Sequence, residues 1–217
     1  IWRWNGATDT SKAIFRATVT ASTYFYLNTI EKIRFDADRK AGFCLVIEGG
    51  AVFGGTGGSN VFNQNFFEGA TVANVLIGSN TEPMALDIDA SFNTFNSCLF
   101  YNAPYNIKIN ATNVYETVLN YSTFGQNNNL AITIQHIRLL RAGMTKIHGP
   151  EFTALDFYVP GHPNGPSDTV YCIWAESPFV LDGGTYMEET RLAYISDGSH
   201  GDNVFYSISD IYTNDSR

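Results

Sequence analysis

Short alternations of apolar and polar residues recur along the chain and predict β-strands. Leu86–Ile88, Ile107–Ile109 and Ile132–Ile134 each place two aliphatic side chains on one face of an extended segment and one polar side chain on the other. Gly, Asn, Ser and Pro separate such runs and mark turns, so strands of about three to six residues are expected. Helical spacing is confined to Asp9–Ala17, where we expect one short helix.

An internal repeat indicates how these strands are arranged. Asn60–Ala70 aligns without a gap on Asn93–Ala103, with Asn, Phe, Asn, Phe and Ala at the same offsets. Asn28–Phe35 is a weaker copy that lies upstream at nearly the same interval, and Asn113–Tyr115 begins a fourth copy that reaches its phenylalanine only at Phe124. Repeats whose length varies in this way indicate a solenoid, because the blades of a propeller are more uniform.

A parallel β-helix explains these repeats, because coils that stack about 4.8 Å apart place like side chains in columns. We expect an all-β fold, a right-handed single-stranded parallel β-helix of about seven to nine turns over residues 23–217, after an irregular cap segment over residues 1–22. An antiparallel sandwich or jelly roll is also rich in strands but has no reason to repeat a gapless pattern. Asn60 and Asn93 are expected at corners, in a left-handed conformation and hydrogen-bonded from turn to turn. The expected columns are Ile88 over Ile109 over Ile134, Phe62 over Phe95 over Tyr115, and Phe35, Phe67, Phe100 and Phe124 in one row.

Charge and hydropathy limit the partners of this protein. The 217 residues carry a net charge of −8, and only Lys108 is a lysine or arginine between Ala41 and Ile137. The chain therefore lacks the basic stripe that nucleic acid requires. No window reaches the roughly 18 apolar residues of a membrane-spanning helix, so no membrane insertion is expected. Ile1 is neither an initiator Met nor the start of a signal-peptide pattern, so we expect a fragment or a processed product.

The cysteines and histidines do not predict a cofactor. Cys44, Cys98 and Cys172 lie in apolar runs and are expected to be small buried thiols. The four histidines have no metal-ligand spacing with other His, Cys or Asp residues, so neither a metal nor another cofactor is expected.

Two segments carry a resemblance to a known family. NTFNSCLFYNA (93–103) and FVLDGGTYMEE (179–189) resemble the right-handed parallel β-helix proteins of the pectin-lyase-like superfamily, and within it bacteriophage tailspikes and related polysaccharide depolymerases. The resemblance covers roughly residues 23–212 and rests on the texture of the repeats. It implies a polysaccharide or cell-surface glycan as partner, a homotrimer, and a location on a virion tail or outside the cell. The catalytic signatures of polygalacturonases and pectate lyases are missing, so none of their residues is carried over.

Candidate chemistry lies toward the C-terminus, because eleven of the 21 acidic residues fall between Glu151 and Arg217. Glycoside hydrolysis needs two carboxyl groups about 5 to 9.5 Å apart, and aromatic rings hold sugars by stacking. The expected catalytic carboxylates are Glu176, Asp182, Glu188 and Glu189, and the expected substrate-binding residues are Trp174, Tyr186, His200 and Asp202.

Other interpretations of these residues stay open. The acids beside Gly183–Gly184 are also explained as solvated carboxylates at an ordinary corner. Asp87 and Asp89 form a second acidic pair, in which Asp87 is expected to pair with Lys108 on the next turn. A non-catalytic adhesin or structural spike would bind glycan through the same aromatic residues. A polysaccharide lyase would need a base, and the C-terminal region is poor in bases.

Overall fold

The computed structural model describes residues 1–19, 24–49, 57–80, 91–111, 116–125, 134–153, 170–188, 191–195, 206–209 and 211–213. Within these residues the protein is all-β, and its strands form three parallel sheets without any helix. We name each sheet after its first strand in the chain.

The β1 sheet contains β1 (Trp2–Arg3), β4 (Arg34–Asp36), β7 (Phe66–Glu68), β10 (Leu99–Tyr101), β13 (Thr123–Gly125), β16 (Glu151–Thr153), β19 (Thr185–Glu188) and β22 (Ile211–Thr213). The β2 sheet contains β2 (Asp9–Val19), β5 (Ala41–Gly49), β8 (Ala73–Gly78), β11 (Tyr105–Asn110), β14 (Ile134–Arg141), β17 (Val170–Ala175) and β20 (Arg191–Ile195). The β3 sheet contains β3 (Thr29–Glu31), β6 (Val61–Asn63), β9 (Asn93–Asn96), β12 (Glu116–Asn120), β15 (Met144–His148), β18 (Phe179–Asp182) and β21 (Tyr206–Ile208).

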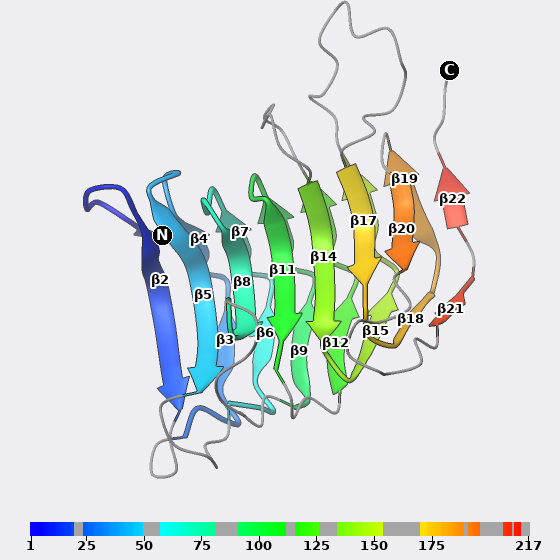
Figure 1. Ribbon diagram of the computed structural model, residues 1–217, viewed down its shortest axis with the longest axis horizontal. Helices are drawn as coiled ribbons and strands as arrows, with labels where there is room; N and C mark the ends of the chain where they lie inside the picture. Colours follow the sequence, from blue (N-terminus) through cyan, green and yellow to red (C-terminus); the bar gives the residue numbers. More distant parts are fainter. Residues whose placement is uncertain are drawn as a thin grey trace, which may run out of the picture.

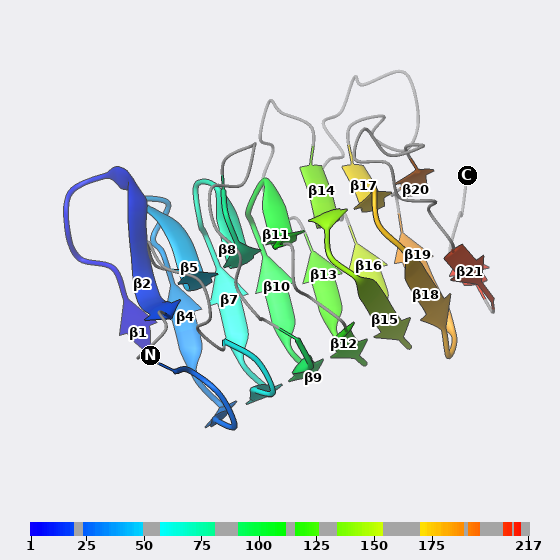
Figure 2. The same cartoon turned by 60° about the horizontal axis from the view of Figure 1, so that its bottom comes forward.

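The chain winds through the three sheets in a fixed order, from the β2 sheet to the β3 sheet and then to the β1 sheet. Neighbouring strands of one sheet are therefore three strands apart along the chain, and they pair in parallel. Figure 1 shows the coils stacked from β2 at the left to β22 at the right, and Figure 2 turns the β1 sheet toward the viewer. The protein is a parallel β-helix, as the repeat predicts, and it is consistent with the right-handed form.

The N-terminal residues are part of this stack. The helix expected over Asp9–Ala17 is wrong, because these residues form most of strand β2, which pairs in parallel with β5. Ala17 and Val19 are buried whereas Arg16 and Thr18 are exposed, and this period of two is that of a strand. Strand β1 pairs with β4 in the same way. Residues that the sequence places in an irregular cap segment thus contribute strands to two sheets.

A row of phenylalanine rings runs through the core along the β1 sheet. Phe35, Phe67, Phe100, Phe124 and Phe152 occupy one register position on successive coils, and each ring stacks on the next with centroids 5.0–5.2 Å apart. All five are fully buried. Stacked rings at this spacing add to the stabilisation that burial of apolar area gives. The expected row of phenylalanines is confirmed and is one ring longer than the sequence predicts.

The other aromatic column and the aliphatic column differ from the expected register in part of their members. Phe62 stacks on Phe95 at 4.6 Å, as expected, but the next residue in that column is Leu119. The aliphatic column is also displaced, because Ile109 pairs with Ile77 and Leu139. Ile134 pairs with Val170 instead. Ile88 and Tyr115 lie outside the described residues.

A two-residue corner joins each described strand of the β3 sheet to the next strand of the β1 sheet, from β3 through β18. The first corner residue has a left-handed backbone in every described case: Lys32 (φ 56°), Gln64 (φ 53°), Ser97 (φ 50°), Tyr121 (φ 49°), Gly149 (φ 57°) and Gly183 (φ 76°). Left-handed backbone is costly for residues other than glycine, so the repetition indicates that stacking fixes this geometry. The corner therefore presents equivalent positions to solvent on successive coils.

Asparagine side chains link the coils at the start of the β3-sheet strands. Asn28 Nδ2 donates to Asn60 Oδ1, and Asn60 Nδ2 donates to Asn93 Oδ1, both at 2.9 Å. The expected hydrogen bonds are confirmed. The expected left-handed conformation of Asn60 and Asn93 is wrong, because the positive φ belongs to the preceding residues, Ser59 and Phe92.

A second polar row lies inside the β2 sheet. Asn74 Nδ2 donates to Asn106 Oδ1, and Asn106 Nδ2 donates to His136 Nδ1, both at 2.8 Å. His136 is fully buried beside the rings of Phe124 and Phe152. Burial disfavours the charged imidazolium and lowers the pKa of His136 to about 3. This imidazole is therefore neutral and structural at physiological pH.

The three cysteines are free and buried, which confirms that prediction. Burial raises the pKa of the Cys98 thiol to about 12 and raises that of Cys44 as well. No helix in the described part of the chain is long and apolar enough to cross a membrane.

Candidate functional site

A row of polar side chains follows the outer edge of the β3 sheet, where each strand reaches its corner. Asn63, Asn96, Asn120, His148 and Asp182 are register partners on successive coils. Asn96 Nδ2 donates to Asn63 Oδ1 and Asn120 Nδ2 donates to Asn96 Oδ1, each at 2.9 Å. These five residues, which we call the outer ladder, are all partly exposed. The ladder therefore offers hydrogen-bonding groups to solvent along the axis of the stack.

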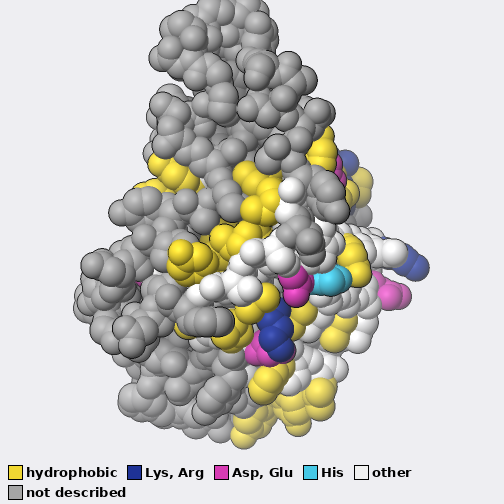
Figure 3. Space-filling model, turned by 90° about the vertical axis from the view of Figure 1, so that its right-hand side faces the viewer, with side chains coloured by type: hydrophobic (Ala, Val, Ile, Leu, Met, Phe, Trp, Pro, Cys, Tyr) yellow, Lys and Arg dark blue, Asp and Glu magenta, His cyan; other side chains and the backbone are white. Residues whose placement is uncertain are grey.

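Three side chains at the C-terminal end of the outer ladder form a hydrogen-bonded triad. His148 Nδ1 lies 2.6 Å from Asp182 Oδ1, and His148 Nε2 lies 2.9 Å from the Tyr121 hydroxyl. Tyr121 occupies the left-handed corner position of the coil before His148. The side chains of His148 and Asp182 are 41% and 49% exposed and Tyr121 is 62% exposed, so all three groups are open to a ligand. Figure 3 shows a histidine beside an acidic side chain on this end of the molecule.

The hydrogen positions in this triad follow from its chemistry. An ionised carboxylate only accepts hydrogen bonds, so the Nδ1 hydrogen of the neutral imidazole points to Asp182. Nε2 then carries a lone pair and accepts the hydrogen of the Tyr121 hydroxyl. The arrangement places a base next to a phenol and a carboxylate behind the base, which is the order of groups in a nucleophilic triad.

Glycines make room for both rings of the triad. A Cβ on Gly149 would lie 2.7 Å from the Tyr121 ring, and a Cβ on Gly183 would lie 2.4 Å from the His148 ring. Gly149 and Gly183 occupy the left-handed corner position of Tyr121 one and two coils later. The two rings meet edge to face at 5.0 Å. Each ring thus packs on the backbone of the next corner, which restricts its orientation.

The structure brings two of the sequence-predicted residues together elsewhere. Glu176 Oε1 accepts from Arg138 Nη2 at 2.7 Å, and the Arg138 guanidinium lies 5.1 Å from the centre of the Trp174 ring. Arg138 and Trp174 are register partners on β14 and β17 of the β2 sheet. Glu176 is largely buried, with 9% exposed. Its carboxylate is therefore engaged by an arginine and shielded from solvent.

Glu176 and Asp182 are not brought together. Glu176 follows β17 and precedes β18, whereas Asp182 is the last residue of β18. The two carboxylates thus lie at opposite ends of that strand, one held by Arg138 and the other by His148.

The remaining candidates lie on β19 or outside the described residues. Tyr186 is partly exposed and lies opposite Glu151 on the neighbouring coil. Glu188 is the last residue of β19, and the structure does not describe its side chain. Glu189, His200 and Asp202 lie outside the described residues, as do Asp87 and Asp89. The ion pair expected between Asp87 and Lys108 therefore stays a prediction; Lys108 lies opposite Leu76 and Arg138, and its Nζ donates to the Asn80 backbone oxygen at 2.9 Å.

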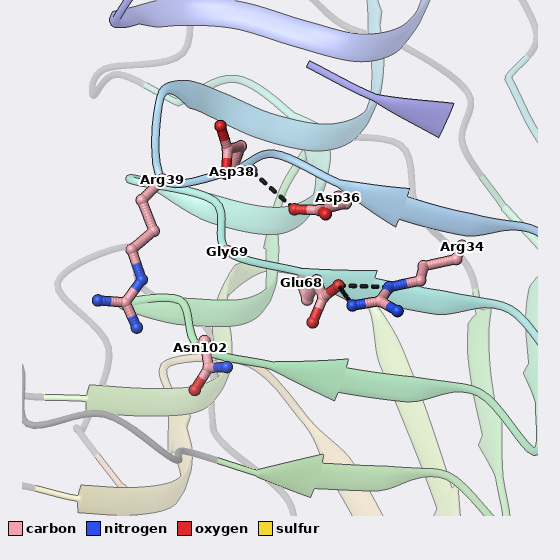
Figure 4. A pocket seen from close by; sticks show the side chains of 7 residues that line it. All are labelled: Arg34, Asp36, Asp38, Arg39, Glu68, Gly69 and Asn102. Atoms are coloured by element: carbon pink, nitrogen blue, oxygen red, sulfur yellow. Dashed lines mark hydrogen bonds and ion pairs between the residues drawn. The ribbon is translucent and has the colours of Figure 1, made fainter. Parts of the chain in front are cut away.

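An open pocket of about 210 Å³ lies near the opposite end of the β1 sheet (Figure 4). Its lining is Arg34, Asp36, Asp38, Arg39, Glu68, Gly69 and Asn102. Arg34 Nε donates to Glu68 Oε1 at 2.5 Å, and Arg3 Nε donates to Asp36 Oδ2 at 2.6 Å. The carboxylates of Glu68 and Asp36 thus have cationic partners from the protein itself, which favours a structural role for this network.

Sequence reasoning found Asp182 but missed Tyr121 and His148, which are far from their triad partners along the chain. Within the described part, no group of three or more His, Cys, Asp or Glu side chains is placed to hold a metal ion.

Comparison with known proteins adds nothing to this description, since no protein-family model, curated protein or solved structure matches the chain. The fold class, a parallel β-helix, rests on the register of the chain's own strands.

Proposed function

We propose that this protein is a carbohydrate-active β-helix that binds and cleaves a polysaccharide along the corner between the β3 and β1 sheets. The observation that carries the proposal is the outer ladder, a row of partly exposed hydrogen-bonding side chains on successive coils, with the exposed Tyr121 ring beside its member His148. A polysaccharide presents repeated hydroxyl groups along its length, and a row of amides repeated at the coil spacing of about 4.8 Å matches such a ligand.

Aromatic and charged groups at the end of the ladder support the same ligand class. The Tyr121 ring is 62% exposed, and an exposed aromatic face packs well against the C–H groups of a sugar ring. The net charge of −8 disfavours a nucleic acid on this surface and is compatible with a neutral glycan.

Cleavage is assigned to carboxylates near the C-terminal coils. Asp182 lies at the end of the ladder, and Glu188 ends the next strand of the same coil. Glu189 completes the proposed catalytic set, with Tyr186, His200 and Asp202 as binding residues. Glu176 and Trp174 contact Arg138 of the β2 sheet, away from this corner, and are not part of the proposed site. Hydrolysis by such groups would release reducing ends.

Two substitutions at Tyr121 and Glu188 test the proposal. Tyr121→Ala should weaken binding to the polysaccharide that the protein selects from a panel by about tenfold. The matched control is Tyr26→Ala, which removes another exposed tyrosine ring (48% exposed) just before β3, at the N-terminal end of the stack. Glu188→Gln should abolish release of reducing ends while binding is retained. The proposed site is wrong if Tyr121→Ala and Tyr26→Ala bind equally well.

The products decide between the remaining interpretations. Binding without any cleavage would indicate a non-catalytic adhesin or structural spike. Unsaturated sugar products would indicate a lyase, for which His148 and Tyr121 supply the bases that the sequence alone does not place near Asp182. We also propose a tailspike-like homotrimer on a virion tail or outside the cell, which light scattering of the purified protein tests through its mass.

A further inference from the structure

We propose that this protein has a second activity, the hydrolysis of O-acyl esters carried by a polysaccharide. The catalytic triad for this activity is Tyr121, His148 and Asp182. Tyr121 is the nucleophile, His148 the base, and Asp182 the residue that orients the base. This activity goes beyond glycan cleavage and yields a different product, a carboxylic acid.

The distances fit this assignment. The Tyr121 hydroxyl is 2.9 Å from His148 Nε2, and His148 Nδ1 is 2.6 Å from Asp182 Oδ1. A nucleophile, its base and the orienting group in a hydrolytic triad lie within about 2.6 to 3.2 Å of one another in the same order. All three side chains are 41% or more exposed, so an ester on a polymer can reach the phenol oxygen without entering a deep cavity.

The chemistry proceeds in two balanced steps. The Tyr121 oxygen bonds to the acyl carbon while His148 Nε2 takes the phenol hydrogen, and the sugar oxygen leaves with that hydrogen. Water then attacks the acyl–tyrosine ester, with His148 taking a hydrogen from the water and returning it to the phenol oxygen. The carboxylic acid and the free sugar hydroxyl are the products, and the triad is restored.

The phenol side chain suits the second of these steps. Phenols are more acidic than sugar hydroxyls, so a phenolate leaves an ester more readily than a sugar alkoxide does. The acyl–Tyr121 intermediate is therefore hydrolysed faster than the original ester, and the imidazolium that forms during each step is stabilised by the Asp182 carboxylate.

Packing of the two rings holds the triad in position. The absence of a Cβ at Gly149 and Gly183 lets the rings of Tyr121 and His148 pack on the backbone of the following corners. Both corners repeat the left-handed geometry of the other described corners of the stack. Preorganised rings of this kind avoid reorganisation during the reaction.

The test measures acetate released from 4-nitrophenyl acetate and from O-acetylated xylan by the purified protein. Tyr121→Phe keeps the ring and removes the hydroxyl, His148→Asn removes the base, and Tyr26→Phe is the matched control. We expect Tyr121→Phe and His148→Asn to lose at least about a hundredfold in rate and Tyr26→Phe to match the wild type. Thermal unfolding of each variant checks that it is folded.

An acid quench during turnover of 4-nitrophenyl acetate, followed by peptide mass spectrometry, should find the acetyl group on Tyr121, because nitrophenolate leaves more readily than the tyrosine phenolate and the intermediate accumulates. That adduct is a signature that a purely structural role for the triad would not produce. The proposal is overturned if the wild type releases no acetate above the Tyr121→Phe background, or if Tyr121→Phe retains the rate while His148→Asn loses it. Reducing ends are measured in parallel, so a failure of glycan cleavage is distinguished from a failure of ester hydrolysis.

Discussion

The buried imidazole of His136 should cause the protein to lose stability as the solution is acidified. A histidine in the unfolded chain takes up a proton near pH 6.5, whereas burial lowers the pKa of folded His136 to about 3. Between these values the unfolded chain binds more protons than the folded protein, so the free energy of unfolding falls with falling pH. Between about pH 7.5 and about pH 5, His136 alone accounts for a loss of about 2 kcal/mol.

His136→Asn isolates this contribution from the other titrating groups. An asparagine oxygen at this position accepts from Asn106 as the imidazole does, and it does not titrate. Urea unfolding of both proteins at both pH values gives the free energies. The wild type should lose about 2 kcal/mol more than the variant on acidification. Equal losses in the two proteins would refute the claim that His136 is buried in its neutral form.

Three further outcomes follow from the packing. Phe100→Ala removes a ring from the middle of the phenylalanine row and should lower the free energy of unfolding by about 3 to 5 kcal/mol in urea titrations. Gly183→Ala should cost about 1 to 3 kcal/mol, because φ is 76° and the new Cβ would lie 2.4 Å from the His148 ring, and the imidazole resonances in NMR spectra should shift. The thiols of Cys44 and Cys98 should not react with a disulfide reagent until the protein unfolds, because burial raises their pKa values; rapid reaction of the native protein would contradict their burial.

The sequence predicts the fold wherever successive coils keep the same length. Phe35, Phe67 and Phe100 follow one another at nearly equal intervals, so their common position is visible as a repeat. The next intervals, to Phe124 and then to Phe152, are shorter and differ from each other, because the connections into and out of the β2 sheet vary in length. Alternation alone does not determine the register across such connections, so the expected aliphatic column is displaced.

The corner between the β3 and β1 sheets has the same length on each described coil from β3 to β18. This constant length allows most of the site residues to be located from the sequence. A polar residue stands four positions before an inward phenylalanine in Asn96/Phe100, Asn120/Phe124 and His148/Phe152. Aligning the coils on this spacing would place His148 in the outer ladder. The bond from Tyr121 to His148 is not predictable in this way, because it depends on side-chain rotamers and on the space above Gly149.

The most direct test of the account is an experimental structure of the protein with a bound oligosaccharide of the polysaccharide it selects. We predict that the sugar lies along the outer ladder, with one ring against Tyr121 and a hydroxyl within hydrogen-bonding distance of Asp182. A sugar bound instead at Arg138 and Trp174 on the β2 sheet, with the ladder free of ligand, would contradict the proposed site.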